Sequence, residues 1–286
     1  MTSDRLDVRK TYKLYIGGAF PRSESGRSYP VVDGKGSVMA RPARASRKDL
    51  RDAVRAARAA WTDWSEATAY NRGQVLYRVA ELMEGRREQF VQELAQLGVK
   101  DADQEVGAAI DRWVWYAGWS DKVHHVIGTV NPVAGPYFDF TIPEPTGVVG
   151  VVAPDEPALL GLVSRLAPAI VSGNAAVVLA SQTHPLSAVT LCEVLATSDV
   201  PAGVVNVLTG LKAELVPWLA GHMDVNAVDL IGVPQHLLAE VEAVTANNVK
   251  RTVRDVVADW YDDAAQSPYL VTEFMEMKTV WHPMGA

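Results

Sequence analysis

The stretch Gly147-Val-Val-Gly-Val-Val152 indicates the fold class of this chain. It contains only glycine and valine, so it lacks the alternation of apolar and polar residues that marks a strand with one solvated face. A wholly apolar run of this length suits a β-strand that helices cover on both sides, as in a parallel sheet. A helical pattern follows it, with apolar residues at Leu159, Leu162, Leu166 and Ile170.

The same order of buried strand and helix repeats along the next part of the chain. Apolar runs predict strands at residues 175–179, 204–208 and 227–231, and helical patterns lie between them at 186–195 and 213–220. A series of β–α units produces parallel strands joined by right-handed crossovers. The sequence therefore predicts an α/β fold with a Rossmann-like doubly wound parallel sheet.

The residues before this sheet predict N-terminal helices and a small antiparallel sheet. Ser46 is placed to cap a long amphipathic helix, and two more such helices follow before residue 127. Alternation favours a hairpin at residues 12–32, and residues 129–146 return to strand chemistry. After residue 254 the pattern weakens. We expect residues 256–260 to continue a helix, and a polar linker to lead to Pro268 and a closing strand.

Composition excludes several classes of function. The chain has 286 residues, of which 48% are hydrophobic and 21% charged, as in ordinary globular proteins. A formal net charge of −7 argues against nucleic-acid binding, which needs a concentrated basic face. No apolar run approaches the roughly 20 residues that span a bilayer. We therefore expect a cytoplasmic protein that contacts neither nucleic acid nor membrane.

Cysteine and histidine give no sign of metal or thiol chemistry. Cys192 is the only cysteine, so an intrachain disulfide and a thiolate metal cluster are excluded. It lies in an apolar helical stretch, where a buried structural cysteine is the expectation. The histidines fit neither a zinc-binding helix nor a catalytic triad, and we predict no metal site.

Eight short segments, taken in order, resemble the aldehyde dehydrogenase superfamily over nearly the whole chain. They are Lys13-Leu-Tyr-Ile-Gly-Gly18, Val38-Met-Ala-Arg41, Trp115-Tyr-Ala-Gly-Trp119, Glu144-Pro-Thr-Gly-Val-Val-Gly150, Leu166-Ala-Pro-Ala169, Gly173-Asn174, Pro201-Ala-Gly-Val-Val-Asn-Val-Leu-Thr-Gly210 and Lys278-Thr-Val-Trp281. Each is weakly specific alone, but their order is strongly specific. The resemblance implies an enzyme that oxidises aldehydes to acids with NAD or NADP, through a cysteine thiohemiacetal and hydride transfer.

The resemblance also divides the chain into domains. Residues 46–127 and 147–258 are similar to the NAD-binding domain, and residues 1–45, 128–146 and 268–286 are similar to the oligomerisation strands. In the family, the catalytic domain with the reactive cysteine lies between the end of the NAD-binding domain and the closing strand. Residues 252–272 alone occupy that interval here. We therefore expect the catalytic domain to be absent and assign no catalytic residue.

The resemblance gives six candidates for a remnant of the cofactor cleft: Pro154, Glu156, Leu179, Ser181, Gln182 and Gly232. The family's proline-tryptophan-asparagine-phenylalanine loop aligns with Pro154-Asp-Glu-Pro157. Its asparagine donates to a developing oxyanion, whereas an ionised Glu156 can only accept. We interpret Asp155 and Glu156 as a carboxylate-rich helix start, which the helix dipole favours, rather than as an acid/base pair.

The other cleft positions also differ from the family pattern. Leu179 and Gln182 stand where a lysine and a glutamate would hold the adenosine ribose. The pair Val233-Pro234 follows Gly232 at the helix start near the pyrophosphate, and it lacks both a hydroxyl and one backbone N–H. Asp255 aligns with the general base, and we interpret it as a solvated helix residue. We assign no cofactor and expect NAD binding, if it is retained, to be weak.

The closing segment, residues 273–281, indicates assembly with another subunit. Alternation places Met275, Met277, Thr279 and Trp281 on one mostly apolar face, and an exposed strand edge of this kind tends to pair with another strand. In the family this segment acts with the strands near residues 12–32 and 129–146 to form a dimer. It also extends a sheet in the catalytic domain of the neighbouring subunit.

Our leading hypothesis is therefore a non-catalytic subunit that assembles with a full-length aldehyde dehydrogenase, and self-association as a dimer stays open. In this respect the chain resembles the second, incomplete half of the sixteenth aldehyde dehydrogenase family. Two other functions also stay open. One is an NAD(P)-dependent aldehyde oxidoreductase with weak or partner-completed activity, and the other is a protein-interaction scaffold.

Overall fold

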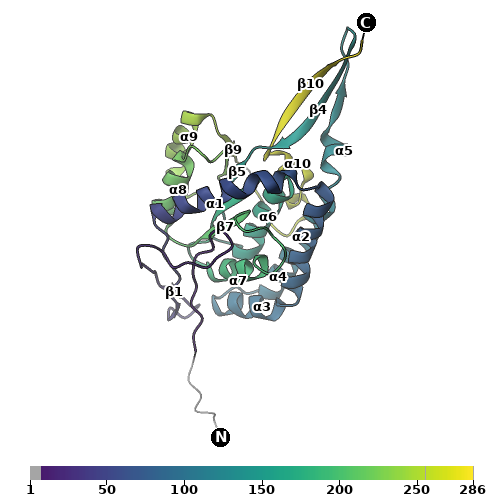
Figure 1. Cartoon of the computed structure of the whole chain (residues 1–286). Coiled ribbons are helices and arrows are strands. Elements are labelled where there is room, and N and C mark those ends of the chain that lie inside the picture. Colours follow the sequence, from purple (N-terminus) through teal and green to yellow (C-terminus); the bar gives the residue numbers. More distant parts are fainter. Residues whose placement is uncertain (1–7, 255, 286) are drawn as a thin grey trace.

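A five-stranded parallel sheet forms the centre of the molecule in the computed structural model, which describes residues 8–254 and 256–285 (Figure 1). The sheet has the order β7-β6-β5-β8-β9. Its strands are β5 (Val148–Val152), β6 (Ala175–Leu179), β7 (Val205–Leu208), β8 (Ala227–Asp229) and β9 (Arg251–Val253). The predicted α/β doubly wound fold is confirmed. The sequence did not reveal β9, because a three-residue strand that begins with arginine and threonine contains no apolar run.

The strand order creates a topological switch beside β5. From β5 the chain moves outward through β6 to β7, and it then returns past β5 to form β8 and β9 on the other side. The connecting helices are α6 (Ala158–Val171), α7 (Leu186–Leu195), α8 (Lys212–Gly221), η1 (Gln235–Leu237), α9 (Leu238–Thr245) and η2 (Ala246–Asn248). In sheets of this kind, ligands bind at the carboxyl ends of the strands where the order reverses.

Two hydrophobic cores, one on each face of the sheet, explain the apolar sequence of β5. Val149 and Val151 belong to the core shared with α6 and α7. Val148 and Val152 belong to the core shared with α8 and the first long helix, α1 (Arg47–Glu66). Every residue of β5 is buried, so no position of the strand has a solvated face.

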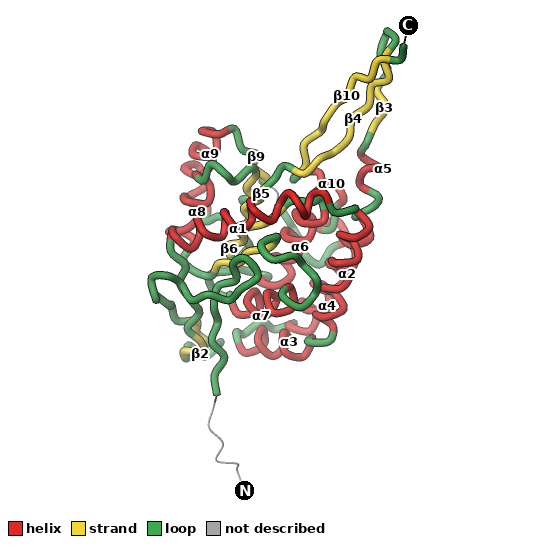
Figure 2. The backbone as a smooth tube through the Cα atoms, viewed as in Figure 1, coloured by secondary structure: helices red, strands yellow, loops and turns green. Residues whose placement is uncertain are grey.

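The N-terminal helices form an outer layer around the sheet (Figure 2). After α1 they are α2 (Ala69–Glu84), α3 (Arg87–Gln96), α4 (Ala102–Trp119) and α5 (Val123–Ile127). Helices α2 and α4 pack on α6, and α3 packs on α7, whereas α1 lies directly on the sheet. In the described part of the chain, none of the helices combines the length and the apolar character that crossing a membrane requires.

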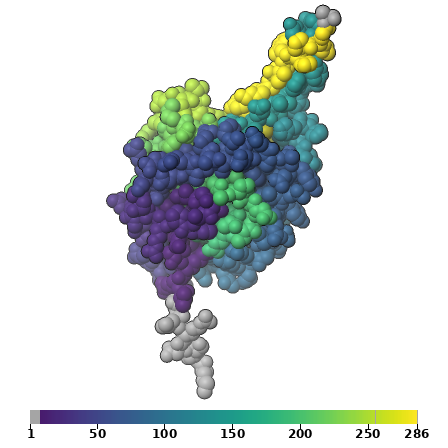
Figure 3. All heavy atoms as spheres, in the orientation of Figure 1, coloured from purple at the N-terminus to yellow at the C-terminus, as the bar shows by residue number. Residues whose placement is uncertain are grey.

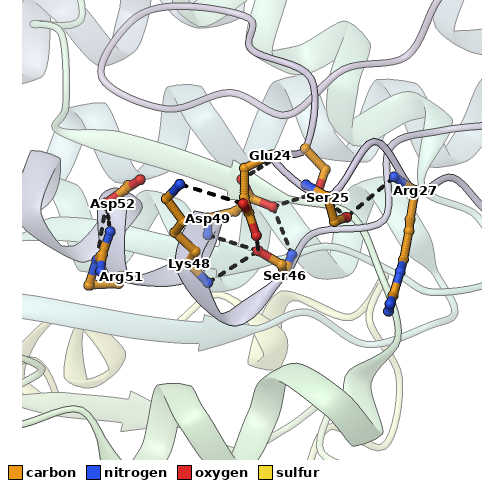
Figure 4. A network of polar contacts seen from close by, with 9 residues as sticks. Glu24, Ser25, Arg27, Ser46, Lys48, Asp49, Arg51 and Asp52 are labelled. Atoms are coloured by element: carbon orange, nitrogen blue, oxygen red, sulfur yellow. Dashed lines mark hydrogen bonds and ion pairs between the residues drawn. The ribbon is translucent and has the colours of Figure 1, made fainter.

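Ser46 begins α1 as the sequence predicts. Its hydroxyl oxygen accepts the backbone N–H groups of Lys48 and Asp49, and the Asp49 carboxylate accepts the N–H of Ser46 at 2.8 Å, which completes a capping box. Figure 4 shows how Glu24 joins this network: its side chain accepts from the Ser46 hydroxyl at 3.0 Å. These contacts fasten the N-terminal segment to the start of α1.

The N-terminal segment forms the predicted hairpin only at its first turn. Around Gly17-Gly18, Ile16 and Ala19 exchange two backbone hydrogen bonds, at 3.0 and 3.1 Å, and the N–H of Leu14 donates to the carbonyl oxygen of Pro21 at 3.1 Å. Tyr15 also exchanges two backbone hydrogen bonds with Val207, at 2.9 and 2.8 Å, at the edge of the central sheet. Strands β1 (Val31–Val32) and β2 (Val38–Ala40) pair only with each other. Within this chain, β1 and β2 thus lie outside the sheet that holds the closing strand, and the assignment of residues 1–45 to oligomerisation stays a prediction.

A three-stranded antiparallel sheet projects from the body of the molecule (Figures 1 and 3). It consists of β3 (Thr129–Asn131), β4 (Tyr137–Pro145) and β10 (Met275–Pro283), in the order β10-β4-β3. We call these three strands the arm. All residues of β10 pair with β4, from Met275 opposite Pro145 to Pro283 opposite Tyr137. The predicted closing strand and the predicted small antiparallel sheet are both confirmed.

Asn174, which is fully buried, joins the arm to the central sheet. Its Oδ1 accepts the backbone N–H of Gly147 at 2.8 Å, between β4 and β5. Its Nδ2 donates to the carbonyl oxygen of Phe274 at 2.7 Å, directly before β10. An ion pair of 3.2 Å between Arg251 on β9 and Glu276 on β10 adds a second connection. Asn174 and the Arg251–Glu276 ion pair thus fix the base of the arm to the central sheet.

The segment between β9 and β10 packs against the helices. No helix forms at residues 256–260, contrary to the prediction; the segment instead contains η3 (Asp263–Ala265) and α10 (Pro268–Thr272), so Pro268 begins a helix. The guanidinium of Arg112 on α4 explains this course, because it donates to the carbonyl oxygens of Trp260 and Ala265 at 3.0 and 2.7 Å. The candidate Asp255 lies outside the described residues.

Candidate functional site

The six cleft candidates lie in or beside the loops at the carboxyl edge of the sheet, where the topological switch places ligand sites. Pro154 and Glu156 follow β5, Leu179 ends β6, Ser181 and Gln182 come directly after it, and Gly232 follows β8. The sequence therefore predicts their common location correctly. Their contacts determine what this edge can bind.

Asp155 is the centre of the polar contacts at this edge. Its Oδ1 accepts the backbone N–H of Gln182 at 2.7 Å and lies 3.0 Å from Nζ of Lys212. Ser181 donates its hydroxyl to the carbonyl oxygen of Asp155 at 3.1 Å. The interpretation of Asp155 as a helix-start carboxylate is therefore wrong. Its charge is engaged by the next loop and by α8, and the helix after it begins only at Ala158.

Lys212 is a site residue that the sequence analysis missed. Its side chain is 3% exposed, and Nζ also donates to the carbonyl oxygen of Ala153 at 2.7 Å. Burial lowers the pKa of Lys212, while the charge and hydrogen bond of Asp155 act in the opposite direction. The available signal was a lysine at the start of a predicted helix. Its position relative to Asp155 depends on the tertiary structure, so sequence alone could not pair the two residues.

The two positions that align with the family's ribose-binding residues, Leu179 and Gln182, mostly make contacts within the chain. Leu179 is buried in the hydrophobic core, so it offers no polar group to a ligand. The side-chain oxygen of Gln182 accepts the backbone N–H of Lys212 at 2.9 Å. Among the described residues, the Nε2 group of Gln182 donates to no protein acceptor. Nε2 of Gln182 is therefore the side-chain donor that positions 179 and 182 can still offer to a ligand.

Gly232 lies directly against the end of β5. Its N–H donates to the carbonyl oxygen of Val152 at 3.0 Å, and a Cβ at this position would overlap the carbonyl group of Ala153. The N–H of Val233 donates to the carbonyl oxygen of Leu230 at 3.0 Å. Since Pro234 has no N–H, none of these three positions supplies a free backbone donor to a phosphate group.

A buried ion pair lies at the end of β8, and the sequence analysis did not single it out. Arg165 on α6 donates Nε to the carboxylate of Asp229, and both side chains are buried almost completely. The second carboxylate oxygen of Asp229 accepts the N–H of Ile231 at 3.1 Å. Such a pair holds α6 and β8 together, because removal of one partner would leave an uncompensated buried charge.

Glu156 differs from the other candidates because its side chain is 78% exposed. Its Oε1 lies 4.0 Å from Nδ1 of His184. The carboxylate at the start of α6 comes from another helix: Oε1 of Glu105 on α4 accepts the N–H groups of Leu159 and Leu160 at 2.7 and 3.3 Å. The N-terminus of α6, where the helix dipole favours an anion, is thus occupied by the carboxylate of Glu105.

Cys192 is a core residue, as the sequence predicts. It is fully buried in α7, and its Sγ donates to the carbonyl oxygen of Ala188 at 3.1 Å. Burial raises the pKa of the Cys192 thiol well above its usual range. Because the thiolate is the nucleophilic form, this cysteine is not suited to attack an aldehyde.

The sheet order and its topological switch at β5 define a doubly wound α/β protein with the fold of the dinucleotide-binding class. Within that class, the chain belongs to the aldehyde dehydrogenase family, whose sequence pattern ("Aldehyde dehydrogenase family") matches residues 20–256. It is 32% identical to cytosolic 10-formyltetrahydrofolate dehydrogenase of Mus musculus over 263 residues. This alignment covers 86% of this chain and 28% of the mouse protein. It is 31% identical to retinal dehydrogenase 2 of Homo sapiens, over 88% of this chain and 49% of that protein.

A solved structure shows the same fold. The crystal structure of a putative aldehyde dehydrogenase from Burkholderia cenocepacia superimposes with a TM-score of 0.81 at 28% identity, over 85% of this chain and 50% of that chain. The present chain thus spans about half of that protein and less than a third of the mouse one. The family pattern ends at residue 256, so the likeness of the closing strand to the family's oligomerisation strand remains a prediction from the sequence.

The close contact of Gly232 with β5 gives a test of the cleft geometry. We expect Gly232→Ala to lower the free energy of unfolding by about 1–3 kcal/mol, because the new methyl group must displace backbone atoms. Gly118→Ala is the matched control, because Gly118 is exposed on α4 and has open space around its Cβ position. Alanine favours a helix more than glycine does, so this change should raise the free energy of unfolding by up to about 1 kcal/mol. Urea unfolding measures both, and equal effects of the two changes would contradict the described packing.

Proposed function

We propose that this chain is a non-catalytic aldehyde dehydrogenase-like subunit that assembles with a full-length aldehyde dehydrogenase through its arm. The observation that carries the proposal is a projecting sheet with an unpaired edge and apolar residues on both faces. The contacts within the cleft agree with it, because the polar groups that could hold a cofactor mostly bind one another. The only cysteine, Cys192, is buried in α7 and cannot take the place of the family's nucleophile.

The arm exposes apolar side chains on both of its faces. On one face of β10, Met277 and Trp281 are 47% and 59% exposed, and Tyr137 of β4 packs edge-on against Trp281. On the other face, Val280 and Phe138 are also exposed. Among the described residues, β10 pairs only with β4, so its other edge carries unpaired backbone groups. Proteins normally cover or blunt such an edge, and apolar patches of this kind mark interaction sites.

A full-length relative is the partner that this arm fits. In the resemblance described above, the closing strand extends a sheet in the neighbouring subunit's catalytic domain. The described chain runs from β9 to β10 through two short helical segments and offers no sheet of that kind between them. A second copy would bring the same surfaces, whereas a full-length enzyme would bring the complementary sheet. Self-association is therefore the less complementary alternative.

Substitution of one exposed arm residue tests this proposal. We expect Trp281→Glu to weaken binding to a full-length aldehyde dehydrogenase from the same organism at least about 30-fold, the effect of removing an aromatic anchor worth roughly 2 kcal/mol. Tyr70→Glu is the matched control, since Tyr70 is an aromatic residue, 67% exposed, on α2 away from the arm. Biolayer interferometry with the co-purified partner gives both affinities. Equal weakening by the two variants, or none, would reject the arm as the interface.

The second candidate is an NAD(P)-dependent aldehyde oxidoreductase whose activity is weak or completed by a partner. The specific observation in its favour is the Nε2 group of Gln182, which remains available as a donor at the carboxyl edge of a sheet of dinucleotide-binding type. A protein-interaction scaffold, whose helical face or tail binds an unrelated protein, is the third candidate. Pull-downs with and without residues 268–286 would separate it from the first candidate by the identity of the captured partner.

Calorimetric titration with NAD separates the first two candidates. We expect a dissociation constant weaker than about 1 mM, because the phosphate-binding and ribose-binding groups are engaged within the chain. NADP should bind no better. A dissociation constant in the micromolar range, lost in Gln182→Ala but kept in Gln92→Ala on the surface of α3, would instead support the oxidoreductase.

A further inference from the structure

A pocket of about 650 Å³ lies at the amino edge of the central sheet, at the base of the arm (Figure 1). Its walls come from residues that precede three parallel strands: Thr146 before β5, the loop 223–226 before β8 and the turn 248–250 before β9. Arg251 on β9 and Glu276 on β10 complete the walls. The six cleft candidates lie at the opposite, carboxyl edge of the sheet, so this pocket is a separate site.

Lys250 is the buried charged group in the wall of this pocket. The residue is 8% exposed, and its Nζ donates to the carbonyl oxygen of His222 at 2.8 Å. An ammonium group has three N–H donors. In the described part of the chain, however, Nζ of Lys250 forms no ion pair with a carboxylate. Because buried charges in proteins are normally paired, the position of this ammonium group in the wall of a cavity points to an anion that enters it.

The other charges around the pocket do not neutralise Lys250. Arg251 and Glu276 pair with each other at 3.2 Å. In the loop before β8, Arg58 of α1 donates to the carbonyl oxygen of Asp224 at 2.7 Å. Among these five residues, three cations thus face two carboxylates. A singly charged anion would balance the group, whereas Glu276 in the pocket wall would repel a second negative charge.

The ionisation of Lys250 agrees with the missing counter-ion. Burial lowers the pKa of Lys250 to about 8, and no carboxylate opposes this change. Burial also lowers the pKa of His222; Asp224 opposes this, and the charge of Lys250 adds to it. His222 is therefore mostly neutral at neutral pH, and the charge that changes as the pH rises past about 8 is that of Lys250. An anion beside Lys250 would favour its charged form.

A carboxylate with a short hydrocarbon chain suits the remaining walls. Lys250 offers a charged donor, and such hydrogen bonds to carboxylates are strong. Oδ1 of Asn226 accepts from Arg58 at 2.6 Å, while its Nδ2 donates to no acceptor among the described residues, so this amide is a further donor in the pocket wall. Met223 and Val249 supply apolar surface. The volume of the pocket accommodates a small organic molecule.

We infer that this pocket binds a small monocarboxylate, whose carboxylate group accepts from Nζ of Lys250 and whose hydrocarbon part lies against Met223 and Val249. The inference does not depend on the proposed assembly or on the cofactor cleft. A chain that stays alone in solution and binds no NAD would still show it.

Isothermal titration calorimetry with sodium butyrate in a low-salt buffer tests the inference on the whole chain. At neutral pH we expect saturable binding of butyrate at millimolar or lower concentration, and at least about tenfold weaker binding of 1-butanol and of n-butylammonium, which have no carboxylate. The affinity for butyrate should fall as the pH rises above about 8, because Lys250 then loses the proton that its charge requires. Absence of butyrate binding, or equal binding of 1-butanol, would overturn the inference.

Removal of the ammonium group places the ligand. Lys250→Met should weaken butyrate binding about tenfold or more. The carbonyl oxygen of His222 keeps the N–H of Val225 as a donor at 3.1 Å, so this change leaves no buried acceptor without a partner there. Lys48→Met is the matched control, since Lys48 is 53% exposed on α1, and it should have no effect. Unchanged affinity in a folded Lys250→Met variant would contradict the site.

A pair of variants at Val249 changes only the charge of the pocket wall. Val249 is 91% exposed and has a left-handed backbone with φ of 54°. Asparagine and aspartate adopt this conformation more readily than valine, so Val249→Asn and Val249→Asp should both fold. We expect Val249→Asp to bind butyrate several-fold more weakly than Val249→Asn, because it adds a negative charge to the pocket. Equal affinities of these two variants would overturn the inference even if Lys250→Met failed to fold.

Discussion

The side chain of Asn174 is the constraint on which the arrangement of the molecule depends. It lies at the turn between α6 and β6, and its two polar atoms bind the link between β4 and β5 and the start of β10. Because these groups are buried, loss of the amide would leave the backbone N–H of Gly147 without its partner and would remove one of the donors to the carbonyl oxygen of Phe274. The arm therefore takes its direction from the same residue that closes the first β–α–β unit. The central sheet and the arm form one connected structure.

The carboxyl edge of the sheet shows a second consequence of this architecture. The switch at β5 brings together loops that in this class of fold bind ligands. Here those loops bind one another: Asp155 holds Lys212 and the Gln182 backbone, Gly232 lies on β5, and Glu105 fills the start of α6. The chain keeps the fold of an aldehyde dehydrogenase cofactor domain while its polar groups serve internal packing. The arm, in contrast, leaves its apolar residues exposed.

The sequence predicted the parts of this structure that local patterns determine. The apolar run of β5, the cap at Ser46 and the alternation in the closing strand each reveal their element directly. Features that depend on distant residues could not be predicted from it. These are the pairing of Lys212 with Asp155, the cap that Glu105 supplies to α6, and the short strand β9. The segment at 256–260 was predicted as a helix because its apolar residues fit that period. Arg112 instead binds the carbonyl oxygens of Trp260 and Ala265, and the segment is a loop.

We propose that this chain acts by assembly with an active relative. Native mass spectrometry of a mixture of the purified chain and a full-length aldehyde dehydrogenase from the same organism tests it most directly. We expect a complex with the summed mass of both chains in a fixed ratio, formed at micromolar concentration. Separate spectra for the two proteins across that concentration range, with this chain present only as a monomer, would contradict it.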